Sequence, residues 1–317
     1  MTGSEADAHR LRRLAEELEE TGLPAGAADP MFLEEVDWAL RPLVHERRVA
    51  STGAILRPSL DVAEWERQTG LSMSGMPIGE RPLVASRRLA DGLSSWLVRP
   101  ANELLLFDRP AGSERDLVVL ARALSATVVQ RHPSGVVRVV GKFGLLRWDG
   151  LRWHREPPLK KWLKVVTGES FTGDPEAIES LVEFAIHDLG AAGIGALLLY
   201  CPSVDEVSGV EERLPIPPPL DVRAPIHLAP LRHVLSQVDG AAMFDAAGVM
   251  RHIGVRLVPT TTAERSVEPL RGTRHTSGRR YSFDHPDVTV IVVSEDGPVS
   301  LLRAGEVLGQ SGAAPGR

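Results

Sequence analysis

Apolar side chains recur along this chain with helical and strand periods, and these periods predict most of its elements. Residues 5–21 show the i, i+3, i+4, i+7 spacing of an amphipathic helix, which ends at Gly22 and Pro24. The same spacing predicts helices over about 32–43, 61–69 and 113–125. The apolar stripe of the first helix is narrow. It suits packing on the body of the protein or pairing with a second copy.

A β-hairpin is predicted around Asp149-Gly150, because this dipeptide suits a two-residue turn between alternating apolar residues. The expected apolar pairs are Trp148 with Leu151 and Leu146 with Trp153. Two arginines then fall on the opposite face. Interleaved aromatic and basic residues also occur where proteins stack nucleic-acid bases. Tryptophans on the apolar face favour a place in the core.

Helices and strands alternate in the second half of the chain. The polar, turn-rich residues near 165–174 predict a domain boundary, after which Asp174 caps a helix that ends at Gly190. The expected strands are 194–201, 241–244, 249–257, 287–294 and 299–303, and the expected helices are 231–238 and 274–284. The proline-rich stretch 202–230 is either a surface loop that frames a site or a connector.

These elements predict an α/β protein with two domains. We expect an N-terminal amphipathic helix over 1–28, a mixed α+β domain over 29–166, a layered α/β domain over 167–310 and a disordered tail over 311–317.

Composition excludes several classes of protein. The chain has 317 residues and one cysteine, Cys201, so neither an internal disulfide nor a four-cysteine zinc site can form. Its beginning lacks the apolar core of a secretory signal, and the stretch Ala191–Cys201 is too short for a membrane helix. We therefore expect a cytoplasmic protein that does not bind membranes. The net charge of −6 argues against general nucleic-acid binding.

The sign of the charge reverses between Arg251 and Arg280, where seven arginines accompany two glutamates. A guanidinium matches phosphate oxygens, so this segment favours an anionic ligand. A solvated basic face is the alternative.

Candidate chemistry gathers in three short segments at the ends of expected elements. The chain contains no P-loop, no zincin spacing and no nucleophile elbow. Asp239 and Glu295 are carboxylates that can converge on one divalent cation. Gly272-Thr273 precedes a helix whose first turn holds Arg274 and His275, which together suit a phosphate. Taken singly, each segment is equally compatible with a turn or a helix cap.

The segments DGA (239–241), GTRH (272–275) and VSE (293–295), in this order and spacing, resemble the diadenylate cyclase domain. That domain occurs in the bacterial DNA integrity scanning protein and in membrane-anchored cyclases of Gram-positive bacteria. The resemblance covers about residues 175–310. It implies a twisted mixed β-sheet flanked by helices. It also implies condensation of two ATP into the second messenger cyclic di-AMP with release of two pyrophosphates, Mg²⁺ or Mn²⁺ as cofactor, and a face-to-face homodimer or higher oligomer.

The resemblance also implies roles for individual residues. Asp239 would bind the metal and orient or activate the ribose 3′-hydroxyl, and Glu295 would be the second metal ligand. Asp239, Arg274 and His275 would form the catalytic set. The expected ATP-binding residues are Gly240, Ala241, Gly272, Thr273, Arg274, His275, Thr276 and Ser294.

One position departs from the family. Many members carry arginine where this chain has Thr276, so one phosphate-binding cation is missing. Arg279 or Arg280, one helical turn further, would replace it. Otherwise the domain would be a catalytically silent nucleotide-binding sensor. The resemblance says nothing specific about the N-terminal half, whose regulatory or sensor role is an expectation by analogy.

Overall fold

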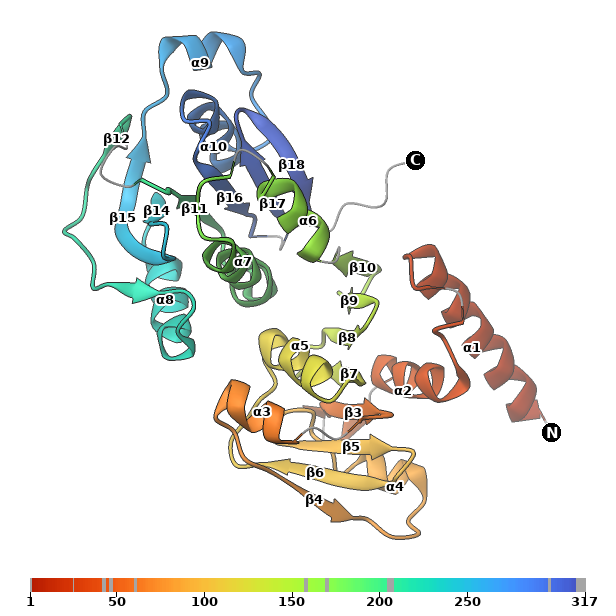
Figure 1. Cartoon of the computed structure of the whole chain (residues 1–317). Coiled ribbons are helices and arrows are strands. Elements are labelled where there is room, and N and C mark those ends of the chain that lie inside the picture. Colours follow the sequence, from red (N-terminus) through yellow and green to blue (C-terminus); the bar gives the residue numbers. More distant parts are fainter. Residues whose placement is uncertain are drawn as a thin grey trace. The chain divides into compact units, whose positions relative to one another are not determined.

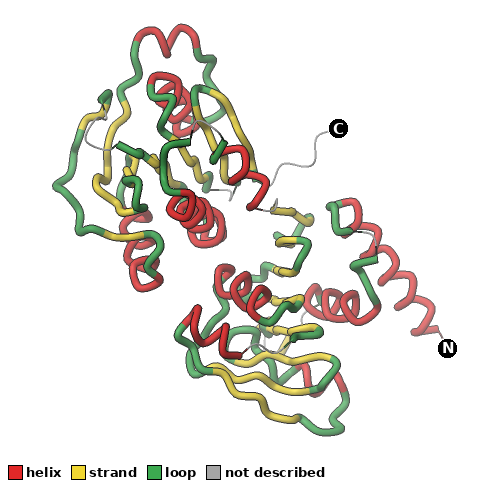
Figure 2. The backbone as a smooth tube through the Cα atoms, in the orientation of Figure 1, coloured by secondary structure: helices red, strands yellow, loops and turns green. Residues whose placement is uncertain are grey.

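The computed structural model describes residues 2–24, 26–41, 44–45, 48–59, 62–156, 159–168, 171–203, 208–295 and 298–311. Backbone contacts divide the chain into two units, Met1–Glu156 and Pro157–Ala313. Each unit has its own eight-stranded sheet with helices (Figures 1 and 2), which confirms the α/β prediction. The disordered tail expected over 311–317 is wrong at Ser311, which is buried and exchanges hydrogen bonds with Val299, and the rest of that tail lies outside the described residues.

The first unit is a mixed sheet with helices on both faces. Its strands follow the order β10-β9-β8-β7-β3-β5-β6-β4, in which β3 and β5 run parallel and the other described neighbours antiparallel. The strands are β3 (Thr52–Leu56), β4 (Met73–Pro77), β5 (Ser95–Arg99), β6 (Glu103–Phe107), β7 (Thr127–Arg131), β8 (Val137–Gly141), β9 (Gly144–Trp148) and β10 (Trp153–Glu156), with a separate pair β1 (Val44–His45) and β2 (Arg48–Val49). The helices are α1 (Thr2–Glu20), α2 (Pro30–Leu40), α3 (Val62–Thr69), α4 (Leu83–Arg87) and α5 (Glu114–Ala123).

Alternation along β3 explains the two helical layers. Ala54 and Leu56 face a core shared with α1 and α2, whereas Ile55 faces the core shared with α3 and α5. Leu14 and Leu18 of α1 are buried in the first of these cores. The first helix therefore packs on its own unit, and the four helices predicted in this half are confirmed.

The predicted hairpin forms, but its register is wrong. Trp153 pairs with Trp148, not with Leu146, so a four-residue loop joins β9 and β10. The Asp149 carboxylate accepts hydrogen bonds from the backbone N–H groups of Leu151 and Arg152, which stabilises this longer loop. Leu151 is therefore exposed. Trp153 is buried and Trp148 packs against the same core, as expected for core tryptophans.

The second unit is also a mixed sheet. Its order is β12-β15-β14-β11-β16-β17-β18, with β13 also paired to β15. The strands are β11 (Ala196–Tyr200), β12 (Val210–Glu211), β13 (Leu220–Asp221), β14 (Ala241–Phe244), β15 (Val249–Leu257), β16 (Thr289–Val293), β17 (Val299–Arg303) and β18 (Glu306–Gln310). The helices are α6 (Leu159–Val166), α7 (Pro175–Phe184), α8 (Pro225–Gln237), α9 (Thr261–Ser266) and α10 (Thr273–Asp284), with a π-helical segment Ala185–Leu189 and a 3₁₀ turn Gly190–Ala192 after α7.

Helices cover both faces of this sheet. Alternate residues of β11 point to a core with α7 and α8 and to a core with α10, where Tyr281 is fully buried. The five predicted strands are confirmed. Two helices differ from expectation: α8 begins earlier, at Pro225, and the α7 segment continues past Gly190. It ends at Gly193, whose φ of 66° provides a left-handed cap.

The division of the chain after Glu156 differs from the boundary expected after residue 166. The reason is α6, whose Trp162 and Val166 are buried in the core of the second unit. This amphipathic helix therefore belongs to the sheet that follows it. Among the described residues, no helix combines the length and the apolar character needed to cross a membrane.

Candidate nucleotide site

Three neighbouring strands of the second sheet bring the predicted segments to one edge. β11 lies between β14, to which it runs parallel, and β16, with which Ala196 pairs at Val293. If each register is extended past its last pair, Gly195 lies next to Asp239 on one side and next to Ser294 on the other. Neighbouring strands lie about 4.8 Å apart, so the backbones at Asp239 and Ser294 are roughly 10 Å apart.

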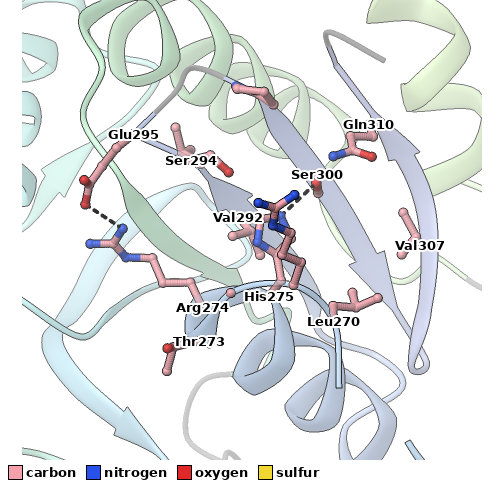
Figure 3. Close-up of a pocket in the computed structure, with 14 residues that line it drawn as sticks. Leu270, Thr273, Arg274, His275, Val292, Ser294, Glu295, Ser300, Val307 and Gln310 are labelled. Carbon is pink, nitrogen blue, oxygen red and sulfur yellow. Dashed lines mark hydrogen bonds and ion pairs between the residues drawn. The ribbon is translucent and has the colours of Figure 1, made fainter. Parts of the chain in front are cut away.

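A cavity of about 980 Å³ opens at this edge (Figure 3). Its walls come from the loop and first turn of α10, the end of β16, and strands β17 and β18. Seven of the predicted site residues or their neighbours line it: Gly272, Thr273, Arg274, His275, Val293, Ser294 and Glu295. Arg271, Ser300 and Gln310 also line it and were not predicted.

Arg274 and Glu295 form an ion pair across the start of β11. Arg274 Nη1 donates to Glu295 Oε1 at 3.1 Å, and both side chains remain substantially exposed (Figure 3). A Cβ on Gly195 would lie 2.5 Å from Arg274 Nη1 and 2.8 Å from Glu295 Cγ. The lack of a side chain at Gly195 therefore leaves space for the side chains of Arg274 and Glu295 to meet.

His275 is a neutral hydrogen-bonding group inside the cavity wall. Its Nε2 lies 3.1 Å from the hydroxyl of the buried Ser300 on β17. Burial lowers the pKa of His275 below its ordinary value of 6.5. An imidazole held neutral near pH 7 presents one donor nitrogen and one acceptor nitrogen. Ser300 occupies one nitrogen, which leaves Nδ1, on the side of Gly272, for another partner.

The N-terminus of α10 supplies free backbone donors. Gly272 precedes the helix with φ of 101°, a conformation that favours glycine. The N–H groups of the first helical turn have no partner within a helix, and their dipoles favour an anion. Two arginines, Arg271 and Arg274, stand beside these groups in the cavity wall. These are the groups from which the sequence predicted a phosphate cradle, and that role stays a prediction.

The proposed replacement of the missing cation by Arg279 or Arg280 is wrong. Arg279 donates to the carbonyls of Gly305 and Glu268, and Arg280 donates to the carbonyl of Glu264. Neither residue lines the cavity. Both lie further along α10 than the residues that line the cavity, and carbonyls of neighbouring segments accept their hydrogen bonds.

Thr276 does not line the cavity either. Its hydroxyl donates to the carbonyls of Leu270 and Gly272, at 2.8 and 3.1 Å, and so ties the preceding loop to α10. Arg271, just before Gly272, is an exposed cavity cation with no ion pair to any described residue. Arg271 is therefore a second arginine in the wall of this cavity, beside Arg274. The sequence signal for Arg271 was its position directly before the GTRH segment.

The DGA segment has two different environments. Asp239 is exposed and makes no ion pair within the described part of the chain, whereas the side chain of Ala241 is buried in the core with α10. Gly240 has φ of 108°, and a Cβ there would approach the backbone of Gly254 to 2.7 Å. Only glycine fits this close crossing of β14 and β15. None of the three residues lines the cavity itself.

The arginine-rich segment is only partly available to a ligand. Arg251 pairs with Asp245 and Arg256 with Glu211, both away from the cavity. Within the residues that the structure describes, no group of three or more His, Cys, Asp or Glu side chains is arranged to hold a metal ion. The two candidate carboxylates, Asp239 and Glu295, therefore provide an incomplete metal site on their own.

Comparisons with known proteins agree with this geometry. Residues 184–307 match the DAC family, described as DisA bacterial checkpoint controller nucleotide-binding. Residues 12–156 match the family DACNK, described as a probable sensor domain. No curated protein matches the chain. Among solved structures, it is similar to a hypothetical membrane spanning protein from Bacillus cereus, with 22% sequence identity and a TM-score of 0.31, over 40% of this chain and 60% of that one.

The match over residues 184–307 includes all three segments on which the resemblance rests, and the cavity lies almost entirely within it. Residues 184–307 therefore belong to the DAC nucleotide-binding family, and they follow a DACNK domain in residues 12–156.

Proposed function

We propose that this chain is a diadenylate cyclase that condenses two ATP molecules into cyclic di-AMP and releases two pyrophosphates. The observation that supports the proposal is the cavity at the start of α10, with Arg271 and Arg274 in its wall, next to the end of the sheet where Asp239 precedes β14 and Glu295 follows β16. This edge offers positive groups for a triphosphate and a negative group for a hydroxyl, the two requirements of nucleotidyl transfer.

The triphosphate would bind at the start of α10. The free N–H groups of Thr273 and Arg274 would donate hydrogen bonds to phosphate oxygens, and the guanidinium groups of Arg271 and Arg274 would neutralise the charge of these oxygens. His275 would donate from Nδ1, with Ser300 fixing the ring through Nε2. Arg274 would turn from Glu295 toward the phosphate, which releases the Glu295 carboxylate.

The metal ion would complete the site together with the substrate. Mg²⁺ is usually held by one or two carboxylates, substrate phosphates and water, so two carboxylates without a protein cage fit it. Asp239 and the released Glu295 would hold Mg²⁺ or Mn²⁺. The ion would supply charge neutralisation at the phosphates.

In each half of the reaction, the 3′-oxygen of one ATP attacks the α-phosphorus of the other. A bond from that oxygen to phosphorus forms, the bond from phosphorus to the bridging oxygen breaks with its electron pair leaving on pyrophosphate, and the hydroxyl proton passes to the Asp239 carboxylate or to water. Asp239 would orient the hydroxyl. Because the two halves are identical, a two-fold dimer with one ATP in each protomer matches the chemistry.

The test is incubation of the full chain with ATP and Mn²⁺ or Mg²⁺, followed by chromatography with mass detection. We expect cyclic di-AMP and pyrophosphate in a ratio of one to two. Asp239→Asn should abolish turnover without changing the free energy of unfolding, because Asp239 is exposed and unpaired. Asp287→Asn, another exposed carboxylate of the same domain, is the matched control. Full activity of Asp239→Asn would contradict the role given to Asp239.

The second candidate is a nucleotide-binding sensor without catalysis, and Thr276 favours it, since its hydroxyl serves the loop and not a phosphate. Calorimetry separates the two candidates. With a sensor, the calorimeter would record only the heat of ATP binding and no continuing heat of reaction. No product would accumulate over a range of protein concentrations with either metal.

A further inference from the structure

A second, smaller cavity lies in the first unit, at the ends of three adjacent strands. Leu56 at the end of β3 pairs with Thr127 at the start of β7, and β7 is followed across the sheet by the end of β8. The cavity of about 290 Å³ opens where these ends meet the start of α2. Lys142, in the turn after β8, forms part of its wall.

The charges around this cavity do not balance. Arg57 Nη1 donates to Asp29 Oδ2, and the Asp29 Oδ1 accepts from the backbone N–H groups of Met31 and Phe32 at 3.0 and 3.2 Å. The hydrogen bond from Arg57 lowers the pKa of Asp29, so this carboxylate stays ionised and fully engaged. Lys142 is exposed and has no ion pair to any described residue. One positive charge therefore remains without a counterion.

Two cavity residues have backbone conformations that side chains rarely adopt. Arg57 has φ of 50° and Ser125 has φ of 47°. The N–H of Arg57 donates to the carbonyl of the distant Arg99, so a tertiary hydrogen bond holds this conformation. The N–H of Ser125 donates to the Arg122 carbonyl in the turn that ends α5, where a left-handed residue is a common helix cap. A left-handed conformation is unfavourable for a non-glycine residue such as Arg57, and such residues cluster at functional sites. Here both residues line the same cavity.

The remaining wall is apolar. Phe32 of α2 and Phe143, next to Lys142, meet edge to face with ring centroids 6.2 Å apart. Leu56 lies beside them at the end of β3. Two cations and two hydroxyls, of Arg57, Lys142, Ser125 and Thr127, thus line the same cavity as an aromatic pair. Its volume is at the small end for ligand sites and too small for a nucleotide.

We propose that this cavity binds a small organic anion, with a carboxylate or phosphate head and a compact apolar body about the size of one ring. The head would contact the Lys142 ammonium and the free nitrogens of Arg57. The hydroxyls of Ser125 and Thr127 would complete its hydrogen bonds, and the body would pack against Phe143. This site lies within residues 12–156 and does not depend on the cyclase activity proposed above.

The experiment titrates the full chain with benzoate, phenyl phosphate, inorganic phosphate and the neutral analogue benzamide, using calorimetry. We expect benzoate or phenyl phosphate to bind more tightly than both benzamide and inorganic phosphate. The preference between the two ring compounds then identifies the head group. In Lys142→Gln, the affinity should fall about tenfold, as for one lost charge-assisted contact. Lys160→Gln, which removes an exposed lysine outside the cavity, should bind like the unaltered chain.

Three results would overturn the proposal. The first is no binding of either ring anion, and the second is equal binding of benzamide and benzoate. The third is binding that survives Lys142→Gln but is lost in Arg274→Ala, because the anion would then occupy the nucleotide cavity of the second unit. Lys142 is exposed and unpaired, so its substitution leaves the fold intact and the comparison valid.

Discussion

Replacing Arg274 by alanine is the most direct perturbation of the proposed ATP site. Arg274 lies in the first turn of α10, its guanidinium reaches over Gly195, and its ion pair with Glu295 is the polar contact that it must exchange for a phosphate. The substitution removes a cation without leaving a buried group unpaired, because both partners are exposed. Its effect on binding can therefore be separated from its effect on folding.

The magnitude follows from the exchange of partners. A hydrogen bond to a charged group contributes about 1.5–3 kcal/mol. Breaking an exposed ion pair such as Arg274–Glu295 costs about 0.2–1 kcal/mol. The difference, about 0.5–3 kcal/mol, corresponds to a loss of between about twofold and 150-fold in kcat/KM for ATP. Because the side chain is 40% exposed, solvent weakens the contact, and we expect a loss near tenfold.

The assay is the initial rate of pyrophosphate release over a range of ATP concentrations. Arg256→Ala is the matched control, since Arg256 pairs with Glu211 on an exposed strand and lies outside the cavity. Urea unfolding of both variants checks that stability is unchanged. If Arg274→Ala keeps the kcat/KM of the control, the start of α10 does not hold the triphosphate and the proposed site is wrong.

Three other predictions test the same region. Thr276→Arg should lower the free energy of unfolding by about 1 kcal/mol in urea, because the hydroxyl that ties the loop is lost, whereas Thr276→Ser should not; equal stability would contradict this role. Gly195→Ala should reduce turnover with little loss of stability, because its Cβ would displace the exposed side chains of Arg274 and Glu295, and unchanged kinetics would show that neither side chain acts from its place beside Gly195. Burial lowers the pKa of His275, so the unfolded chain binds its proton more readily. Stability should therefore fall as pH drops below about 6.5 toward the folded pKa, and urea melts should show a smaller fall for His275→Gln.

Sequence patterns predicted the elements well where one face of an element is apolar. Strand β15 and the helix after Asp174 follow from alternation and capping, and both form. The hairpin failed at its register, because the Asp149 side chain stabilises a longer loop that alternation alone does not reveal. The domain boundary was misplaced for a similar reason: α6 has the same periodicity whichever sheet it covers.

The candidate site was predicted only as far as its motifs reach. GTRH and VSE lie in the cavity wall, and the family match covers them. Arg271 was covered only by the arginine-rich segment, and Ser300 carries no motif. The place of Ser300 depends on the pairing of β16 with β17. The idea that Arg279 or Arg280 would reach a phosphate failed because helix spacing does not show which carbonyls surround a side chain.

The central position of β11 has a consequence for how the protein is made. Its neighbours β14 and β16 come much later in the chain. The pairing of Ala196 with Val293 cannot form until β16 has been made. Contacts between such distant residues slow folding. On the ribosome, the first unit can close once Glu156 has emerged, while the apolar segment Leu197–Tyr200 can pair with β14 but lacks its other neighbour, β16, until Thr289–Val293 follows. The nucleotide edge is thus assembled last, and newly made chains are exposed to aggregation through β11 until then.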